Sequence, residues 1–358
     1  MMLTDMKISL KKVATRLPPI ARLLDQRSTL AAALRNATRE RDEAVLEAAR
    51  SAAESDRAIK KIAALQTTLG EYEAKLVRFG EGPPWVPNGH FYSPIAPQEE
   101  IEKDADRIFA PWPRTLPGID LREDEQLKFL EVVRGFYADL PFKAEKVEGL
   151  RYNYGNQAYS YSDGIILNSM LRYARPKRVI EVGSGHSSCM TLDTSEIWLD
   201  NSVECTFIEP YPDLLHSLLK PGDEERISIL PTRVQDVDLS VFKALEADDV
   251  LFIDSTHVSR VGSDVNRLIF DVLPTLAKGV YVHVHDIVYP FEYFRGWIEA
   301  GRAWNEAYLL RAFLENNSDF EIVMFNTFME HFHEDYFAKH LPLCLLNRGG
   351  SIWLRKKD

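Results

Sequence analysis

The stretch that decides the fold is "VIEVGSGHSS", residues 179–188. Apolar and β-branched residues lead into two glycines, and "HSSCMTLDTSEIWL" after them can continue as a helix. A buried strand that enters a glycine turn and then a helix is typical of a doubly wound α/β sheet. Glycines let the backbone approach a ligand closely, and the first N–H groups of a helix can face it. We therefore expect a ligand at this turn.

Short β-branched or aromatic runs recur along the chain, and helical stretches separate the early ones. Such alternation predicts a doubly wound, mostly parallel seven-stranded sheet that is covered by helices on both faces. Ligands bind such sheets beyond the carboxyl ends of the strands, so residues that follow each strand are site candidates. The predicted strands are residues 178–182, 204–208, 226–230, 249–253, 279–285, 320–325 and 351–355.

The composition limits the classes of function. A chain of 358 residues with 43 basic and 54 acidic side chains has a formal charge of -11, which opposes binding to the phosphates of nucleic acid. The three cysteines lack CxxC spacing, so we expect neither a disulfide framework nor a zinc cluster, and a cytoplasmic location fits best. No run approaches the ~20 apolar residues of a transmembrane segment.

Residues 1–80 are predicted to form a helical arm. Strong helix formers dominate from Ile20 to Gly82, and no proline interrupts them. Part of the arm shows the three-and-four spacing of a coiled-coil seam, which favours a homo-oligomer joined through the arm. A solvated helix lying against its own domain is the alternative. The seam positions are Ile62, Leu65, Leu69, Tyr72 and Leu76.

Residues 81–150 are predicted to form a linker and a lid or helical cap, and residues 151–358 the sheet domain. The segment "GEGPPWVPNGHFYSPIAP", residues 80–97, ends the arm because its prolines remove hydrogen-bond donors. Its aromatic residues are costly in a flexible spacer, so we expect it to pack on the globular body, over the site or as a structural loop.

Polar residues stand at successive strand ends. Glu209 follows the second strand, where it could accept hydrogen bonds from a ribose diol, and Gln235 with Asp236 follow the third, where they could face an adenine edge. Glu181 precedes the glycine turn and suits a ligand that carries an ammonium group. A dinucleotide fingerprint GxGxxG would need glycine at position 188, where the chain has Ser188.

With an acidic-x-Gly-x-Gly motif and an acid at the end of the second strand, residues 150–358 resemble the class I S-adenosylmethionine-dependent methyltransferases. The blocks "FYSP", "EVGSGHSS", "FIDSTHVSRVGSDV", "HVHDI" and "RAWNEAYLL" look closest to a bacterial subgroup of uncharacterised small-molecule methyltransferases. One departure is Ser187, where the family more often has a third glycine. The resemblance implies that Glu181, Gly183 and Gly185 hold the methionine part of the donor, Glu209 the ribose, and Gln235 with Asp236 the adenine.

Methyl transfer is an in-line displacement, so the protein must align a nucleophile and remove its proton. The fourth strand is followed by Asp254 and His257, and the fifth ends at His285 and continues to Asp286. Histidine with a pKa near ~6.5 can accept a hydroxyl proton at neutral pH. We predict His257 as the base, assisted by Asp254, with His285 as the second candidate. His283, in the middle of the fifth strand, is predicted to be a core residue.

Metal-dependent sugar O-methyltransferases show a similar arrangement, in which an Asp after the fourth strand and an acidic pair after the fifth hold magnesium. This chain has His285 and Asp286 in place of the acidic pair. The resemblance makes Asp254, His285 and Asp286 candidate Mg²⁺ ligands, and a metal-free mechanism is the alternative.

The resulting hypothesis is methyl transfer from S-adenosylmethionine to a hydroxyl of a small molecule or glycan, with a sugar favoured. The segment "GRAWNEAYLLRAFL" is a candidate for the acceptor side through Arg302, Trp304, Asn305 and Glu306, and the alternative is a helix start that only buries the indole. Two other functions stay open. An NAD-dependent oxidoreductase or epimerase lacks a suitable Tyr-x-x-x-Lys pair, and a coiled-coil scaffold would not need so many polar strand ends.

Overall fold

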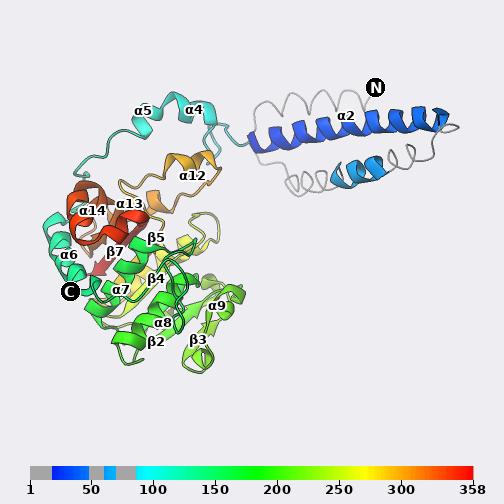
Figure 1. Cartoon of the computed structure of the whole chain (residues 1–358). Helices are drawn as coiled ribbons and strands as arrows, with labels where there is room; N and C mark the ends of the chain where they lie inside the picture. Colours follow the sequence, from blue (N-terminus) through cyan, green and yellow to red (C-terminus); the bar gives the residue numbers. More distant parts are fainter. Residues whose placement is uncertain (1–17, 48–59, 70–85, 358) are drawn as a thin grey trace. The chain divides into compact units, whose positions relative to one another are not determined.

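The computed structural model describes residues 18–47, 60–69 and 86–357, and the chain divides into two compact units at Ala110–Pro111. In the first unit, helix α2 spans Pro18–Glu47 and residues 60–69 are helical (Figure 1). Two short helices follow in the same unit, α4 (Gln98–Lys103) and α5 (Ala105–Ile108).

In the helical segment at residues 60–69, the side that carries the predicted seam is less exposed than the opposite side. Ile62 is only 7% exposed, and Leu65 and Leu69 are half-buried, whereas Lys61 is exposed. Pairing of two arms stays a prediction, because burial on one helix face does not identify what covers it. The other two seam positions, Tyr72 and Leu76, lie outside the described residues.

The second unit is built on one seven-stranded sheet with the order β3-β2-β1-β4-β5-β7-β6. Strands β1 to β5 run parallel to one another, and β7 pairs antiparallel with both β5 and β6. This architecture confirms the predicted fold class. The strands are β1 (Arg178–Val182), β2 (Glu204–Ile208), β3 (Ile227–Leu230), β4 (Val250–Ile253), β5 (Tyr281–His285), β6 (Phe320–Phe325) and β7 (Ser351–Lys356).

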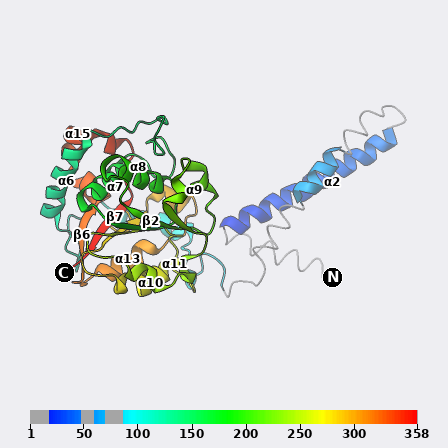
Figure 2. The same ribbon diagram turned by 90° about the horizontal axis from the view of Figure 1, so that it is seen from below.

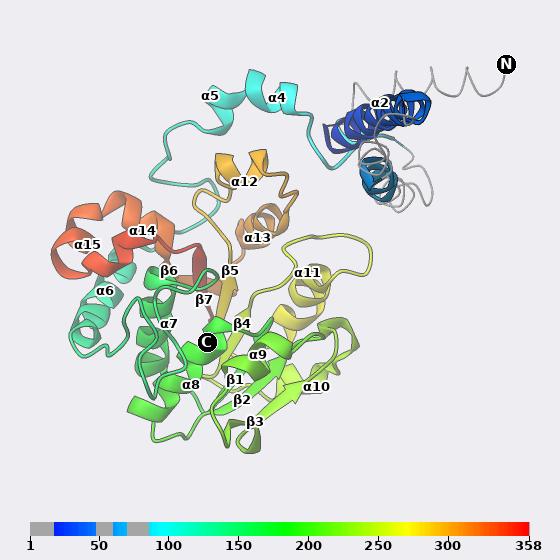
Figure 3. The same cartoon turned by 45° about the vertical axis from the view of Figure 1, so that its right-hand side comes forward.

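Helices cover both faces of the sheet, as Figure 2 shows. One layer contains α6 (Glu123–Tyr137), α7 (Tyr161–Ala174) and α8 (His186–Trp198), and the other contains α10 (Leu239–Lys243), α11 (Asp264–Asn266) and α13 (Glu306–Leu314). The remaining helices of this unit are α9 (Asp213–Leu218), α12 (Arg295–Glu299), α14 (Asn326–Phe332) and α15 (Glu334–His340) (Figure 3).

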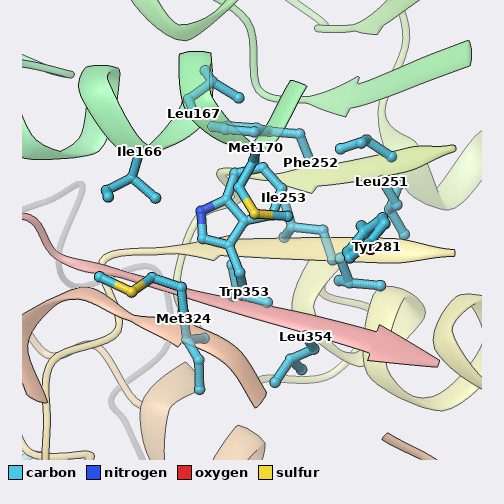
Figure 4. Close-up of a cluster of buried hydrophobic side chains, with 14 of the residues drawn as sticks. Ile166, Leu167, Met170, Leu251, Phe252, Ile253, Tyr281, Met324, Trp353 and Leu354 are labelled. Carbon is cyan, nitrogen blue, oxygen red and sulfur yellow. The ribbon is translucent and has the colours of Figure 1, made fainter. Parts of the chain in front are cut away.

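The core lies between the sheet and these layers. Strands β4 and β5 are buried along their whole length, which explains why β4 reads as the continuous apolar run VLFI. Figure 4 shows Trp353 of β7 among buried side chains that include Met170 of α7 and Phe252 of β4. Each fully buried side chain of this size contributes about 1.5–3 kcal/mol, so the central strands hold the strand ends rigidly in place.

Residues 111–150 belong with the sheet, although the sequence analysis grouped them with the linker. The reason is the amphipathic helix α6, which buries Phe129, Leu130 and Val133. Its Gln126 also accepts a hydrogen bond from the backbone N–H of Phe325 in β6, at 2.7 Å. A lid formed by residues 80–97 stays a prediction.

A search of the described ranges for helices of membrane-spanning length and hydropathy found none.

Candidate functional site

The glycine turn after β1 contacts the end of β4. Gly183 has a φ of +82°, and a Cβ at this position would lie 1.9 Å from the carbonyl oxygen of Asp254. The backbone N–H of Asp254 donates to the carbonyl of Val182 at 2.8 Å, which holds the two strand ends together. Only glycine satisfies both the left-handed conformation and the close approach. The turn predicted to hold a ligand therefore lies directly beside Asp254.

The buried Glu181 is held by two serines, Ser187, which stands where the family more often has glycine, and Ser188. Its Oε1 accepts hydrogen bonds from Ser187 Oγ at 2.5 Å and Ser188 Oγ at 2.9 Å. Ser188 Oγ in turn accepts the N–H of Gly185 at 3.0 Å, so the departure from the glycine pattern has a structural role. Glu181 Oε2 is buried and has no partner among the described residues. Burial raises the pKa of Glu181 to about 8.

Glu209 lies beside the same turn, at the end of β2. Its carboxylate accepts the N–H of Ser184 at 3.4 Å and that of Tyr211 at 2.9 Å. The hydroxyl of Ser184 is buried and lacks a partner within the described part of the chain. The structure thus brings together Glu181, Gly183 and Glu209, and their contact with a donor stays a prediction.

The two residues predicted to face adenine lie in different surroundings. Gln235 is half-buried, and its side-chain amide donates to the carbonyl of Gly262 at 3.1 Å, in the loop that follows β4. Asp236 is exposed and forms an ion pair with Arg233 at 2.8 Å. Gln235 therefore faces the loop of the proposed site, whereas the Asp236 carboxylate is engaged by a surface arginine. Adenine contact by either residue stays a prediction.

His257, Asp254 and Asp286 converge at the ends of β4 and β5. The Nε2 atom of His257 lies 3.4 Å from Asp254 Oδ1 and 3.5 Å from Asp286 Oδ2. His257 has a φ of +60°, and the backbone N–H groups of Asn305 and Glu306 both donate to its carbonyl, at 3.0 and 3.2 Å. A left-handed histidine is strained, so these bonds from the start of α13 hold the imidazole in place.

Glu306 is a site residue whose role the sequence did not indicate. Its carboxylate is 1% exposed, and Oε2 lies 2.9 Å from His257 Nδ1. Its Oε1 accepts a hydrogen bond from Ser255 Oγ at 3.2 Å. An acid in the first turn of a helix is common, so the sequence offers no signal that distinguishes this one. The pairing depends on α13 folding back onto the loop after β4.

The protonation state of His257 differs from the expectation based on an ordinary pKa. Burial alone would lower its pKa, but the hydrogen bonds to Asp254 and Glu306 outweigh burial and raise the pKa to about 10. His257 therefore carries a proton at neutral pH in this state of the protein. Burial also opposes the charged form of Asp254, but the nearby His285 and His257 lower the pKa of this carboxylate.

The two histidines of β5 have different environments. His285 is buried, and its Nε2 lies 3.7 Å from Asp286 Oδ1. Burial opposes its charged form, but the carboxylates of Asp254 and Asp286 raise its pKa. His283 stacks on Phe252 at 4.0 Å between ring centres, and burial lowers its pKa well below the usual range. His283 is thus a neutral core residue, as predicted.

The predicted magnesium ligands do not form a metal site as they are placed. Within residues 18–47, 60–69 and 86–357, no group of three or more His, Cys, Asp or Glu side chains has an arrangement that could hold a metal ion. The protonated imidazole of His257 lies between Asp254 and Asp286, where a cation bound by the two carboxylates would have to lie.

Comparisons with known proteins place part of the chain in a family. Residues 180–287 match the family model described as a methyltransferase domain. An uncharacterised protein from Archaeoglobus fulgidus is 36% identical over 166 residues, which cover 45% of this chain and 73% of that relative.

Solved structures with a similar fold include a methyltransferase from Podospora anserina bound to S-adenosylhomocysteine. It is 16% identical, with a TM-score of 0.38, over 72% of this chain and 97% of that one. An O-methyltransferase from Streptomyces achromogenes involved in tomaymycin synthesis is also 16% identical, with a TM-score of 0.37, over 73% and 99% of the two chains.

Both TM-scores are below 0.5, so the assignment rests on the family match and on the chain's own features. The matched residues run from β1 to just beyond β5 and include Glu181, Gly183 and Asp254. The seven-stranded, mostly parallel sheet is the one expected from the sequence resemblance. The chain belongs to the class I S-adenosylmethionine-dependent methyltransferases.

Proposed function

We propose that this chain transfers a methyl group from S-adenosylmethionine to a hydroxyl of a small molecule or glycan, with a sugar as the favoured acceptor. The observation that carries the proposal is the position of Asp254. Its backbone touches the glycine turn at Gly183, and its side chain lies 3.4 Å from His257. A group that can move a proton is therefore next to the turn assigned to the donor, as methyl transfer to a hydroxyl requires.

The residues at the turn fit the donor chemically. A buried carboxylate oxygen without a partner, Glu181 Oε2, is suited to accept hydrogen bonds from an ammonium group. Gly183 and Gly185 would hold the methionine part, Glu209 the ribose, and Gln235 with Asp236 the adenine. When bound, S-adenosylmethionine supplies the electrophilic methyl group on its sulfonium.

Glu306 determines which ring nitrogen of His257 exchanges a proton. Because a buried carboxylate lies 2.9 Å from Nδ1, that nitrogen keeps its proton and donates a hydrogen bond to Glu306. Nε2 is then the nitrogen that gains and loses a proton, and it faces Asp254 and Asp286. The acceptor hydroxyl would have to approach Nε2 from the side of these two carboxylates.

The high pKa of His257 means that the base must first be deprotonated. The value of about 10 depends on negative charge around the imidazole. A positive charge beside Asp254 would offset that charge and lower the pKa of His257. We infer that donor binding and loss of the Nε2 proton are coupled, which leaves neutral His257 able to accept the acceptor proton.

The first experiment is a calorimetric titration with S-adenosylhomocysteine, with NAD as the parallel ligand. Micromolar affinity for S-adenosylhomocysteine alone, a free energy of about -8 kcal/mol, is expected. Absence of binding, or a preference for NAD, would overturn the donor assignment.

A second experiment separates binding from chemistry. His257→Ala should bind S-adenosylhomocysteine nearly as well as the wild type but lose methyl transfer by about 10²–10⁴-fold, because only the proton acceptor is removed. His216→Ala, an exposed histidine that pairs with Glu224, is the matched control and should retain activity. Full activity of His257→Ala would show that another group is the base.

The proposal also includes a cytoplasmic protein that associates with further copies of itself through the helical arm. The three-and-four spacing of Ile62, Leu65 and Leu69 supports this pairing. Sedimentation of the full chain and of a variant with Ile62 and Leu65 changed to Lys measures it. A larger species that survives the double substitution would contradict pairing through this seam.

A further inference from the structure

An aromatic surface lies beside His257 and takes no part in the mechanism proposed above. Its members are Phe294, Trp297 and Trp304, in the segment between β5 and α13. The ring centre of Trp304 lies 4.5 Å from that of His257, and the ring of Trp297 lies 5.4 Å from Trp304. Phe294 contacts Trp297 edge-on at 5.2 Å and is 38% exposed. We call these three residues the aromatic platform.

Arg302 extends from the same segment over the platform. Its guanidinium carbon lies 4.7 Å from the ring centres of both Trp297 and Trp304. The chain folds back to place it there: Gly301 has a φ of +84°, and the backbone N–H of Arg302 donates to the carbonyl of Trp297 at 3.1 Å. The two indole rings therefore hold the guanidinium in a defined position.

The charge of Arg302 is not neutralised by a described residue. Within the described ranges its guanidinium has no ion pair or hydrogen bond, whereas Arg295, seven positions earlier, pairs with Glu299 at 2.8 Å. Asp254 and Glu306, the acidic side chains beside His257, are already engaged by its imidazole. A guanidinium whose faces rest on aromatic rings still presents its N–H groups at the edges.

The platform is connected to the proposed base through the backbone. Asn305, the residue after Trp304, donates its N–H to the carbonyl of His257 at 3.0 Å. Its side-chain oxygen also accepts the N–H of Ser259 at 2.6 Å. A molecule bound at Arg302 is therefore held at a fixed position relative to the His257 imidazole.

We propose that Arg302 binds an anionic group, a carboxylate or a phosphate, of the same acceptor whose hydroxyl is methylated. This inference rests on the proposed function and specifies its acceptor as a sugar acid or a sugar phosphate. The guanidinium matches carboxylate and phosphate oxygens in a bidentate geometry, and the apolar face of a sugar ring can lie on the exposed aromatic surface. A neutral sugar would leave the guanidinium without a partner.

Binding of three matched probes tests the inference without turnover. Tryptophan fluorescence of the full chain is followed during titration with glucose, glucuronate and glucose 1-phosphate. The wild type should bind at least one anionic sugar about tenfold or more tightly than glucose, and which of the two binds identifies carboxylate or phosphate. Arg302→Met, which keeps the length but removes the charge, should lose this preference. Arg295→Met is the control and should keep it.

Methyl transfer to the same three sugars gives the second readout. The kcat/KM ratio of the preferred anionic sugar to glucose should fall about tenfold or more in Arg302→Met, while the affinity for S-adenosylhomocysteine is unchanged.

Equal or undetectable binding of all three probes by the wild type, or an unchanged preference in Arg302→Met, overturns the inference. If the anions bind through Arg302 but S-adenosylhomocysteine does not bind, the proposed function fails and the anion site stands. If S-adenosylhomocysteine binds and only neutral sugars are methylated, the anion site fails and the proposed function stands.

Discussion

The carboxylate of Glu306 lies 2.9 Å from Nδ1 of His257, although 49 positions separate the two residues in the chain. The contact joins the first turn of α13 to the loop after β4. It leaves Nε2 of His257 facing Asp254 and Asp286, at 3.4 and 3.5 Å. The imidazole therefore has one nitrogen fixed by a buried acid and one that can exchange a proton. This division is the pattern expected of an oriented general base.

Removing the charge of Glu306 should shift the pH dependence of activity. Methyl transfer requires neutral His257, so the rate should rise with pH through the pKa of this imidazole. In Glu306→Gln that pKa falls because one of the charges that raises it is lost. The rising limb of kcat against pH should therefore move to lower pH by about one unit or more. Glu315→Gln, an exposed acid that pairs with Arg311, is the control. An unmoved limb would show that Glu306 does not act on the base.

The wild type should lose stability as the pH rises from about 6.5 towards 10 because of His257. A group whose pKa is raised by folding binds its proton more tightly in the native state. The stability that this group contributes is complete at pH values below its pKa in the unfolded chain. It is lost as the pH rises through the pKa of the group in the folded protein. The free energy of unfolding, measured with urea at a series of pH values, should fall by an amount on the order of 5 kcal/mol over this range. His257→Gln should show a smaller decrease, and equal slopes would contradict the raised pKa.

Substitution of Gly183 should weaken donor binding. In Gly183→Ala the new Cβ would meet the carbonyl oxygen of Asp254 at 1.9 Å, so the turn or β4 must move. We expect the affinity for S-adenosylhomocysteine to fall about tenfold or more by calorimetry. Gly222→Ala is the matched control, because Gly222 also has a positive φ, +87°, but nothing within 4 Å of its Cβ position. Equal losses in both variants would assign the effect to backbone conformation alone.

Chelation should leave the reaction unchanged. The His257 imidazole contacts both Asp254 and Asp286, and no group of three or more His, Cys, Asp or Glu side chains among the described residues is placed to hold a metal ion. Activity should therefore survive treatment with EDTA, and added magnesium should not increase it. Loss of activity with EDTA and recovery with magnesium would reinstate Asp254, His285 and Asp286 as metal ligands.

A buried ion network supports the sheet domain. Arg151 contacts Asp193 at 2.7 Å and Asp223 at 2.5 Å, and all three side chains are almost fully buried. Arg151→Met leaves two buried carboxylates without this partner and should cost about 3–5 kcal/mol of unfolding free energy. Arg226→Met removes a half-exposed arginine from the same Asp223 and should cost about 0–1 kcal/mol. Urea denaturation measures both, and similar losses would show that burial does not decide the cost.

The sheet could be predicted because its signal is local. All seven expected strands are present, and their observed ends differ from the predicted ends by at most two residues. Runs such as "VLFI" in β4 are buried on both faces and need no distant information to be recognised. The position of Asp254 and His257 also followed from the sequence, since residues after parallel strands gather at one edge of the sheet.

Two features could not be interpreted from the sequence alone. Residues 111–150 were assigned with residues 81–110 to a linker and a lid or helical cap, yet α6 buries Phe129, Leu130 and Val133 in the unit that contains the sheet. Ser187 and Ser188 looked like departures from a glycine motif, and only their hydrogen bonds to Glu181 show what they do.

The sequence by itself determined the α/β fold, the glycine turn and the strand ends at which polar residues gather, because each depends on neighbours along the chain. The tertiary structure decided the chemistry of those residues. The pKa of His257 is about 10 because Asp254 and Glu306, from different segments, surround one buried imidazole. Arg302 contacts two indoles because the chain folds back at Gly301. Charge and burial depend on distances in space, and these are set only when the chain has folded.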